Sequence, residues 1–275
     1  MNEHPTNIEA APVFDDNEAA VVDTFVVPSY LHHFWQCAER MVLVGEGARV
    51  AHLGSLTGFP ANQILSKMPN TTGVGVDSSD ACVALANQKL PQELFSYKVA
   101  DPAHSELPGG AFSHVLLLHP QGSAEARRGL FSEAARLLYA GGQLVVSLPL
   151  SRSFPEIIDL IDEFALKYDD ATITSALQKA AEGKVTIEAV SDELELAGFH
   201  DIDFDVQSKS LSFDSGREFL DDPSVRYFIA PQLEAWLDQA DLAAALEYVG
   251  RAIDKYWSDS KMELGFTVAA LSARR

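Results

Sequence analysis

The chain has 275 residues, of which 47% are hydrophobic, and its 40 acidic and 20 basic residues give a formal net charge of −20. So acidic a surface repels phosphate backbones and the sequence has no basic patch, which excludes nucleic acid as a partner and favours a small molecule or a protein. No run of about 18 apolar residues occurs, so no membrane-spanning segment is predicted.

The first 25 residues are expected to form an acidic, flexible tail. Residues 1–23 hold six acidic residues and no lysine or arginine, whereas a secretory signal peptide needs a basic start followed by an apolar run. The two cysteines, Cys37 and Cys82, are far apart in apolar helical contexts, which predicts reduced thiols in the core. Both features predict a cytoplasmic protein.

Strand and helix patterns alternate between residues 26 and 150. After a helix over 26–44, short apolar runs predict strands at 49–54, 72–77, 95–100, 114–119 and 143–148. Helical patterns lie between them at 59–68, 79–90 and 125–139. Successive β–α units build parallel sheets with helices on both faces, so residues 26–150 are predicted to form a doubly wound, mostly parallel sheet.

The pattern changes beyond residue 150. Helices are predicted over 154–167, 173–182, 190–197 and 231–257, and strands over 201–212 and 265–273. The two late strands, with helices inserted between them, are expected to pair at the edge of the sheet. Residues 151–275 are therefore expected to complete the same domain.

Glycines and acids follow the first three predicted strands, where ligands bind in doubly wound sheets. Gly54 and Gly58 bracket the first turn and let the backbone approach a ligand, although an ordinary tight turn would also use them. Asp77 ends the second strand and can accept hydrogen bonds from both hydroxyls of a ribose, or cap the next helix. Asp101 ends the third strand, where it would meet an adenine amino group.

Together with the apolar fourth strand and the stretch from Glu133 to Ser147, these features resemble the class I S-adenosylmethionine-dependent methyltransferases. That stretch is similar to the family's helix, Lys-Pro-Gly-Gly turn and fifth strand, with Tyr139-Ala140 in place of Lys-Pro. The resemblance implies a Rossmann-like α/β fold with a seven-stranded sheet, inserted helices and a C-terminal antiparallel edge hairpin. It also implies S-adenosylmethionine as cofactor, held by His52, Gly54, Ser55, Leu56, Gly58, Asp77, Ser78, Asp101 and Pro102.

Two loop residues depart from the family pattern, which has an acid at the end of the first strand and then Gly-x-Gly-x-Gly. Leu56 replaces the middle glycine, but the catechol and caffeoyl-coenzyme A O-methyltransferases are similar in having a bulky residue there. His52 replaces the acid that helps to hold the cationic amino-acid end of the cofactor. A neutral imidazole attracts that end less and a protonated one repels it, so weaker binding or a rearranged contact is expected.

The same O-methyltransferases resemble one another in metal-binding acids, an Asp that ends the fourth strand and a later Asp-Asn pair. This sequence has His119-Pro120 at the first place and Asp169-Asp170 in its late helical region. No metal is therefore predicted.

The end of the fourth strand should face the transferred methyl group, which makes His119 the candidate base. The alternative is a structural histidine whose ring forms hydrogen bonds with the backbone at the strand end. Tyr30, His32, His33 and Trp35 cluster on the N-terminal helix, which in this family often lies over the cofactor. Tyr30, His33 and Trp35 are candidate lid or substrate contacts, or the inward face of an amphipathic helix.

Two functions fit the sequence. The first is methyl transfer from S-adenosylmethionine to a small-molecule acceptor. The second is a catalytically inactive pseudo-methyltransferase that serves as a protein-binding or scaffolding module, an alternative that His52 and the acidic surface favour. A nicotinamide-dependent oxidoreductase fits poorly, because Gly54 to Gly58 lacks the spacing of Gly-x-Gly-x-x-Gly.

Overall fold

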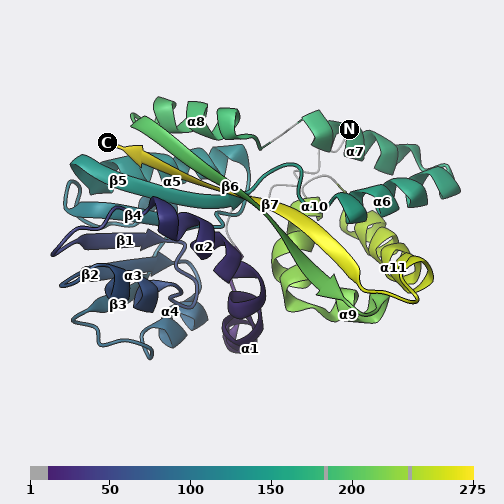
Figure 1. Cartoon of the computed structure of the whole chain (residues 1–275), viewed down its shortest axis with the longest axis horizontal. Coiled ribbons are helices and arrows are strands. Elements are labelled where there is room, and N and C mark those ends of the chain that lie inside the picture. The colour runs from purple at the N-terminus through teal and green to yellow at the C-terminus, as the bar shows by residue number, and fades with distance from the viewer. Residues whose placement is uncertain (1–11, 183–184, 235–236) are drawn as a thin grey trace, which may run out of the picture. The chain divides into compact units, whose positions relative to one another are not determined.

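The computed structural model of the protein describes residues 12–182, 185–234 and 237–275 (Figure 1). Its backbone contacts form two compact units. Among the described residues, the larger unit comprises 12–148, 187–207 and 268–275, and the smaller unit comprises 149–186 and 208–267. That residues 151–275 complete a single domain stays a prediction.

Seven strands form one sheet in the order β3-β2-β1-β4-β5-β7-β6. They are β1 (Arg49–Leu53), β2 (Thr72–Asp77), β3 (Phe95–Val99), β4 (Phe112–Leu118), β5 (Leu138–Pro149), β6 (His200–Phe213) and β7 (Met262–Arg274). The first five are parallel, while β7 pairs with β5 in the opposite direction and β6 forms the edge (Figure 1). The predicted doubly wound sheet with an antiparallel edge is confirmed.

The first four strands lie where the apolar runs predict them, whereas β5 begins five residues earlier than expected. Gly141 and Gly142 stand where the family resemblance implies a turn between helix and strand, but they lie within β5, and Gly141 has a φ of 81°. In the pairing of β4 with β5, Phe112 faces Leu138 but His114 already faces Gln143. The extra residues of β5 relative to β4 therefore form a bulge at these glycines, because glycine adopts a left-handed backbone conformation at little energetic cost.

The N-terminal helix begins ten residues earlier than expected. It consists of α1 (Asp16–Val21), the π-helical η1 (Val22–Leu31) and α2 (His32–Met41). Asp15 and Glu18 form a capping box that starts it. Phe14, Ala19 and Val22 are buried, so this part of the expected tail packs against the domain through one face, and residues 1–11 lie outside the described residues.

The remaining helices of the larger unit connect the strands. They are α3 (Ala61–Lys67), α4 (Asp80–Ala86), the short 3-10 helix η2 (Pro102–His104), α5 (Ala124–Leu137) and α8 (Ile187–Leu196). Ser79 and Ser123 cap α4 and α5 with their hydroxyls. Arg127 of α5 and Glu193 of α8 form a bidentate ion pair with both N–O distances at 2.7 Å, which fixes α8 against α5.

Some helices of the smaller unit lie where the sequence pattern predicts them, and two others lie where no helix was predicted. Predicted are α6 (Pro155–Tyr168), α7 (Ala171–Glu182), α10 (Ala230–Glu234) and α11 (Gln239–Tyr256), and omitted are α9 (Gly216–Asp221) and η3 (Val225–Ile229). Both omitted helices are short, so neither spans enough turns to show a clear helical period.

Two glycines allow α9 and α11 to meet at backbone distance. A Cβ atom on Gly216 would lie 1.9 Å from the carbonyl oxygen of Gly250. We expect Gly216→Ala to lower the free energy of unfolding by about 3 kcal/mol, because rigid backbone must move to relieve the overlap. The matched control is Gly129→Ala in α5, where the new Cβ would lie 3.5 Å from Ala103 and should be neutral or slightly stabilising. Urea unfolding of both variants decides this, and equal losses would contradict the packing described.

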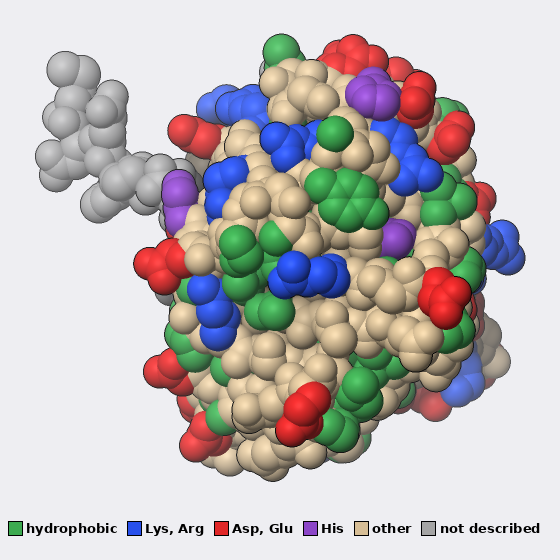
Figure 2. All heavy atoms as spheres, turned by 90° about the vertical axis from the view of Figure 1, so that its left-hand side faces the viewer, with side chains coloured by type: hydrophobic (Ala, Val, Ile, Leu, Met, Phe, Trp, Pro, Cys, Tyr) green, Lys and Arg blue, Asp and Glu red, His purple; other side chains and the backbone are tan. Residues whose placement is uncertain are grey.

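None of the helices in the described part of the chain combines the length and apolar character that a membrane crossing requires. On the face shown in Figure 2, Lys and Arg side chains lie singly or in small groups among apolar and acidic ones. That face therefore has no extended field of one sign.

Candidate functional site

The turn after β1 is a compact loop built on left-handed residues. Gly54, Leu56 and Gly58 have φ values of 68°, 45° and 89°. The backbone N–H groups of Gly54 and Ser55 both donate to the carbonyl oxygen of Val76, which joins the loop to the end of β2. The loop thus lies at the carboxyl edge of the sheet, the predicted ligand-binding edge.

Gly58 is required by space as well as by conformation. A Cβ atom there would lie 2.8 Å from the hydroxyl oxygen of Tyr97, which donates to the Gly58 carbonyl at 3.1 Å. Its left-handed φ would strain any other residue type. Gly58 therefore lets the loop pack closely against Tyr97 of β3.

Asp77 joins the loop to the start of α4. One carboxylate oxygen accepts from the backbone N–H of Leu56 at 2.7 Å, and the other accepts from the N–H of Ser79 at 3.0 Å. The side chain is only 4% exposed, and this burial raises its pKa, although hydrogen bonds from Ser79, Leu56 and Ser78 oppose the rise. Asp77 therefore braces the start of α4, as the capping alternative predicts, while its contact with a ribose stays a prediction.

A small cavity lies beside the loop, lined by Val27, Leu31, His52, Gly54, Ser55, Leu56, Phe59 and Leu118. Its empty volume is about 250 Å³ including the open solvent at its mouth, of which about 10 Å³ can hold the centre of a water molecule. That is room for about one water. None of the lining side chains carries a fixed charge.

His52 and Ser55 bring polar atoms to this cavity that no described residue satisfies. Both ring nitrogens of His52 and the hydroxyl oxygen of Ser55 are buried without a hydrogen-bond partner in the described part of the chain. Burial lowers the pKa of His52 to about 3, so its imidazole is neutral. Orphaned buried polar atoms are costly, and they mark a place where a ligand can supply the missing partners.

The N-terminal helix closes the cavity and is fastened to the loop by contacts that the sequence analysis did not identify. The hydroxyl of Thr57 donates to the Asp23 carboxylate at 2.6 Å. Lys89 forms an ion pair with Asp23 and donates to the Thr57 carbonyl at 2.7 Å. The partners of Asp23 are 34 and 66 residues away in the sequence, so no local pattern indicates these contacts.

His119 follows β4 in a left-handed conformation, with a φ of 50°. Its Nε2 atom lies 3.0 Å from the hydroxyl oxygen of Tyr30, and the ring of Phe34 meets it edge-on with centroids 4.7 Å apart. Burial lowers the pKa of His119 to about 4. A non-glycine residue held in this conformation at a strand end is a feature of functional sites.

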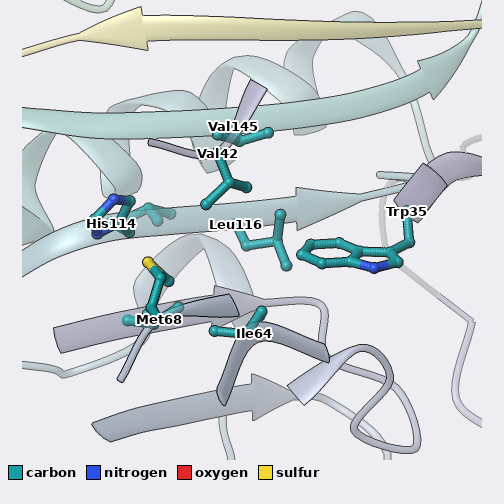
Figure 3. A pocket seen from close by; sticks show the side chains of 9 residues that line it. Trp35, Val42, Ile64, Met68, His114, Leu116 and Val145 are labelled. Carbon is teal, nitrogen blue, oxygen red and sulfur yellow. The ribbon is translucent and has the colours of Figure 1, made fainter. Parts of the chain in front are cut away.

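Other candidate residues lie apart from the cavity. Asp101 caps η2 through the N–H of Ala103, and it pairs with the exposed His104; Pro102, the first residue of η2, is buried. The ring of His33 lies beside that of His32, with centroids 3.8 Å apart and planes tilted by 41°. Trp35 points into a second, apolar cavity against Ile64 and Leu116 (Figure 3).

Comparison with known proteins agrees with this geometry. Residues 51–146 match the model of a methyltransferase domain family. The trans-aconitate 2-methyltransferase of Acidovorax ebreus strain TPSY is 30% identical over 221 residues, covering 76% of this chain and 83% of that protein. The protein of the same name from Acidovorax sp. strain JS42 matches to the same extent.

Solved structures show the same fold at low identity. The Haemonchus contortus phosphoethanolamine N-methyltransferase 2, in complex with phosphomonomethylethanolamine and S-adenosylhomocysteine, superposes with a TM-score of 0.56 at 16% identity. The match covers 95% of this chain but only 58% of that one. A Haloferax volcanii putative methyltransferase, in complex with the activator Trm112, gives a TM-score of 0.52 at 15% identity and covers 95% and 99% of the two chains.

The sequence match extends well beyond the glycine loop, and the structural matches extend over almost the whole chain. The loop after β1, the acid that ends β2 and the antiparallel edge all occupy the positions that the family resemblance implies. The chain therefore belongs to the class I S-adenosylmethionine-dependent methyltransferases.

Proposed function

We propose that this methyltransferase acts on a small molecule that carries an uncharged hydroxyl group, and that His119 removes the proton of that hydroxyl. The observation that supports this most strongly is the buried pair of His119 and Tyr30, held at the carboxyl end of β4 with 3.0 Å between Nε2 and the phenol oxygen. His119 also has a left-handed backbone conformation, which non-glycine residues adopt rarely and often at functional sites.

The residues at the glycine loop fit the cofactor of the family. His52, Gly54 and Ser55 line the cavity, and the neutral polar side-chain atoms of His52 and Ser55 have no partners among the described residues. Asp77, Ser78 and the loop N–H groups would hold the nucleoside, and Asp101 and Pro102 would border it. When bound, S-adenosylmethionine supplies an electrophilic methyl group.

The proposed role of His119 is to accept a proton at Nε2. The acceptor hydroxyl takes the place of the Tyr30 phenol beside the imidazole, and its proton moves to Nε2 as its oxygen gains the methyl group. In the closed arrangement the low pKa keeps the imidazole unprotonated. Hydration on opening raises the pKa towards the ordinary value of about 6.5 and makes the ring a stronger base.

The charge of the site separates this proposal from the activity in the name of the two relatives. Trans-aconitate is a tricarboxylate, and a carboxylate needs no base but does need cationic partners when it is buried. The Tyr30 hydroxyl and the Phe34 ring, which contact the His119 ring, carry no charge, and the ammonium group of Lys89 near the loop is engaged by Asp23. An uncharged hydroxyl acceptor fits these surroundings better.

The test is a methyl-transfer assay with labelled cofactor on a panel of phenols and alcohols, with trans-aconitate included. We expect transfer to a hydroxyl compound, with kcat about 100-fold lower in His119→Asn and less reduced in Tyr30→Phe. Asparagine tolerates the left-handed backbone, so this variant isolates the base. Equal methylation of trans-aconitate by wild type and His119→Asn would overturn the proposal. Cofactor binding without transfer to any compound would favour the protein-binding alternative.

A further inference from the structure

The strand β6 is a long edge of the sheet. It spans 14 residues, His200–Phe213, at one end of the strand order, and it contains neither proline nor glycine. Within the described ranges, β7 is its one neighbouring strand, and residues 201–213 form no backbone–backbone hydrogen bond outside the sheet. An edge of this kind presents a row of N–H and C=O groups to which another strand can pair.

Two apolar side chains are exposed in the middle of β6. Phe204 is 57% exposed and Val206 is 40% exposed. Because they are two residues apart in a strand, both point to the same face of the sheet and lie next to each other. An aromatic and a β-branched side chain stabilise strand pairing when a neighbouring strand supplies apolar partners at the same level. This part of the edge therefore favours a partner strand with apolar side chains at its centre.

The charged side chains of β6 are complementary to a second copy of the same strand. Asp203 and Lys209 are six residues apart, so both point to the face opposite to Phe204 and Val206. When two copies of β6 pair in antiparallel with Val206 opposite Val206, Asp203 of each copy lies opposite Lys209 of the other. Each Phe204 then lies diagonally beside Val206 of the other copy, and the four apolar side chains form one cluster.

The neighbouring registers of such a pair are less favourable. A centre at residue 205 places Asp205 opposite Asp205, and like charges in direct opposition destabilise strand pairing. A centre at residue 207 pairs Lys209 with Asp205, whose carboxylate already lies 3.5 Å from Arg40 and 3.0 Å from the amide of Gln207 in its own chain. The register centred on Val206 instead gives an opposite charge to the exposed Asp203.

We propose that this protein forms a symmetric dimer in which β6 pairs with β6 of a second copy and joins the two sheets into one. The pairing is isologous, since the same segment serves both copies, so association ends at two. Hydrogen bonds between the two main chains supply affinity, and the charge pairs fix the register. The proposal goes beyond the proposed function, because it concerns the sheet edge and not the residues at the carboxyl ends of β1, β2 and β4.

The experiment is sedimentation equilibrium of the full-length protein at about 0.15 M salt, which screens the net charge of −20 on each copy. We expect the wild type to be dimeric at a protein concentration of about 100 μM. Asp203→Lys should raise the dissociation constant at least about tenfold, because two attractive pairs become repulsive, and Val206→Lys should do the same by placing two ammonium groups at the centre. The matched control is Asp162→Lys, the same charge change at an exposed position of α6, which should leave association unchanged.

A mixture of two variants tests the register itself. Lys209→Asp alone should also dissociate the dimer, whereas an equimolar mixture with Asp203→Lys should restore it, because every lysine at position 203 or 209 then faces an aspartate. Hydrogen exchange of the β6 amides should slow with association in the wild type and in this mixture.

A monomeric wild type at the stated concentration would overturn the inference. A dimer that both Asp203→Lys and Val206→Lys leave intact would overturn it too, since the copies would then associate through another surface. Failure of the mixture to associate, when each folded variant is monomeric, would contradict the register. If Lys209→Asp does not fold, the other two variants and the exchange of the β6 amides still decide.

Discussion

Acidification from pH 7 to pH 5 is expected to remove about 4 kcal/mol of folding free energy through His52 and His119 alone. Burial lowers their pKa values to about 3 and about 4 in the folded protein. In the unfolded chain both groups titrate near 6.5, so below that pH the unfolded state binds more protons. Stability is therefore lost as the pH falls from about 6.5, at up to about 1.4 kcal/mol per pH unit for each histidine.

Urea unfolding at pH 7 and pH 5 measures this loss, and a variant with both His52→Asn and His119→Asn isolates it. Carboxyl groups also titrate in this range, but their contribution is common to both proteins and cancels in the difference. His104→Gln serves as a control, because the pKa of this exposed histidine is raised by Asp101 and its removal should not reduce the acid loss. An equal loss in wild type and the double variant would show that these rings are hydrated in the folded protein.

Asp77→Ala is expected to weaken S-adenosylhomocysteine binding by about 100-fold and to lower the free energy of unfolding by about 2 kcal/mol. The substitution removes the acceptor of the Leu56 and Ser79 N–H groups at 2.7 and 3.0 Å. It would therefore release the glycine loop from the start of α4, in addition to removing the proposed ribose contact. A loss of both ligand affinity and stability in Asp77→Ala would distinguish Asp77 from a residue that only caps a helix.

Titration calorimetry and urea unfolding of the same preparation test the two effects. Asp80→Ala is the matched control, because Asp80 is an exposed acid three residues further along and lies in the first turn of α4. It should change stability by no more than about 1 kcal/mol and leave binding intact. A stability loss in Asp77→Ala with unchanged affinity would limit Asp77 to bracing the loop.

Local patterns were sufficient to predict the sheet from the sequence. The strands β1 to β4 are short apolar runs between polar turns, so their burial shows directly in the residue order. The bulge at Gly141 was not predictable, because a glycine pair after a helical pattern also ends helices. The early helix start was visible in the Asp15 and Glu18 capping box, but the acidic composition around it suggested a solvated segment.

The sequence predicts where the candidate site residues lie in the fold, but it does not predict the contacts that hold the N-terminal helix over them. Strand ends place His52, Asp77 and His119 at one edge of a parallel sheet, as the alternation of elements predicts. The N-terminal helix is held to the glycine loop by tertiary contacts between Asp23, Thr57 and Lys89, which are up to 66 residues apart in the sequence. Trp35 lies one turn beyond Leu31 on the same helix face, and this displacement along the helix takes it from the loop cavity to the second, apolar cavity.

In the proposed cofactor site, the N-terminal helix competes with the ligand for the same space. Val27 and Leu31 line the cavity beside His52, and the Asp23 contacts hold the helix to the loop. The apparent affinity for any cofactor is then the intrinsic affinity multiplied by the fraction of molecules in which the helix is open. Each 1.4 kcal/mol of closure lowers affinity about tenfold, and at high ligand concentration the binding rate levels off at the opening rate of the helix.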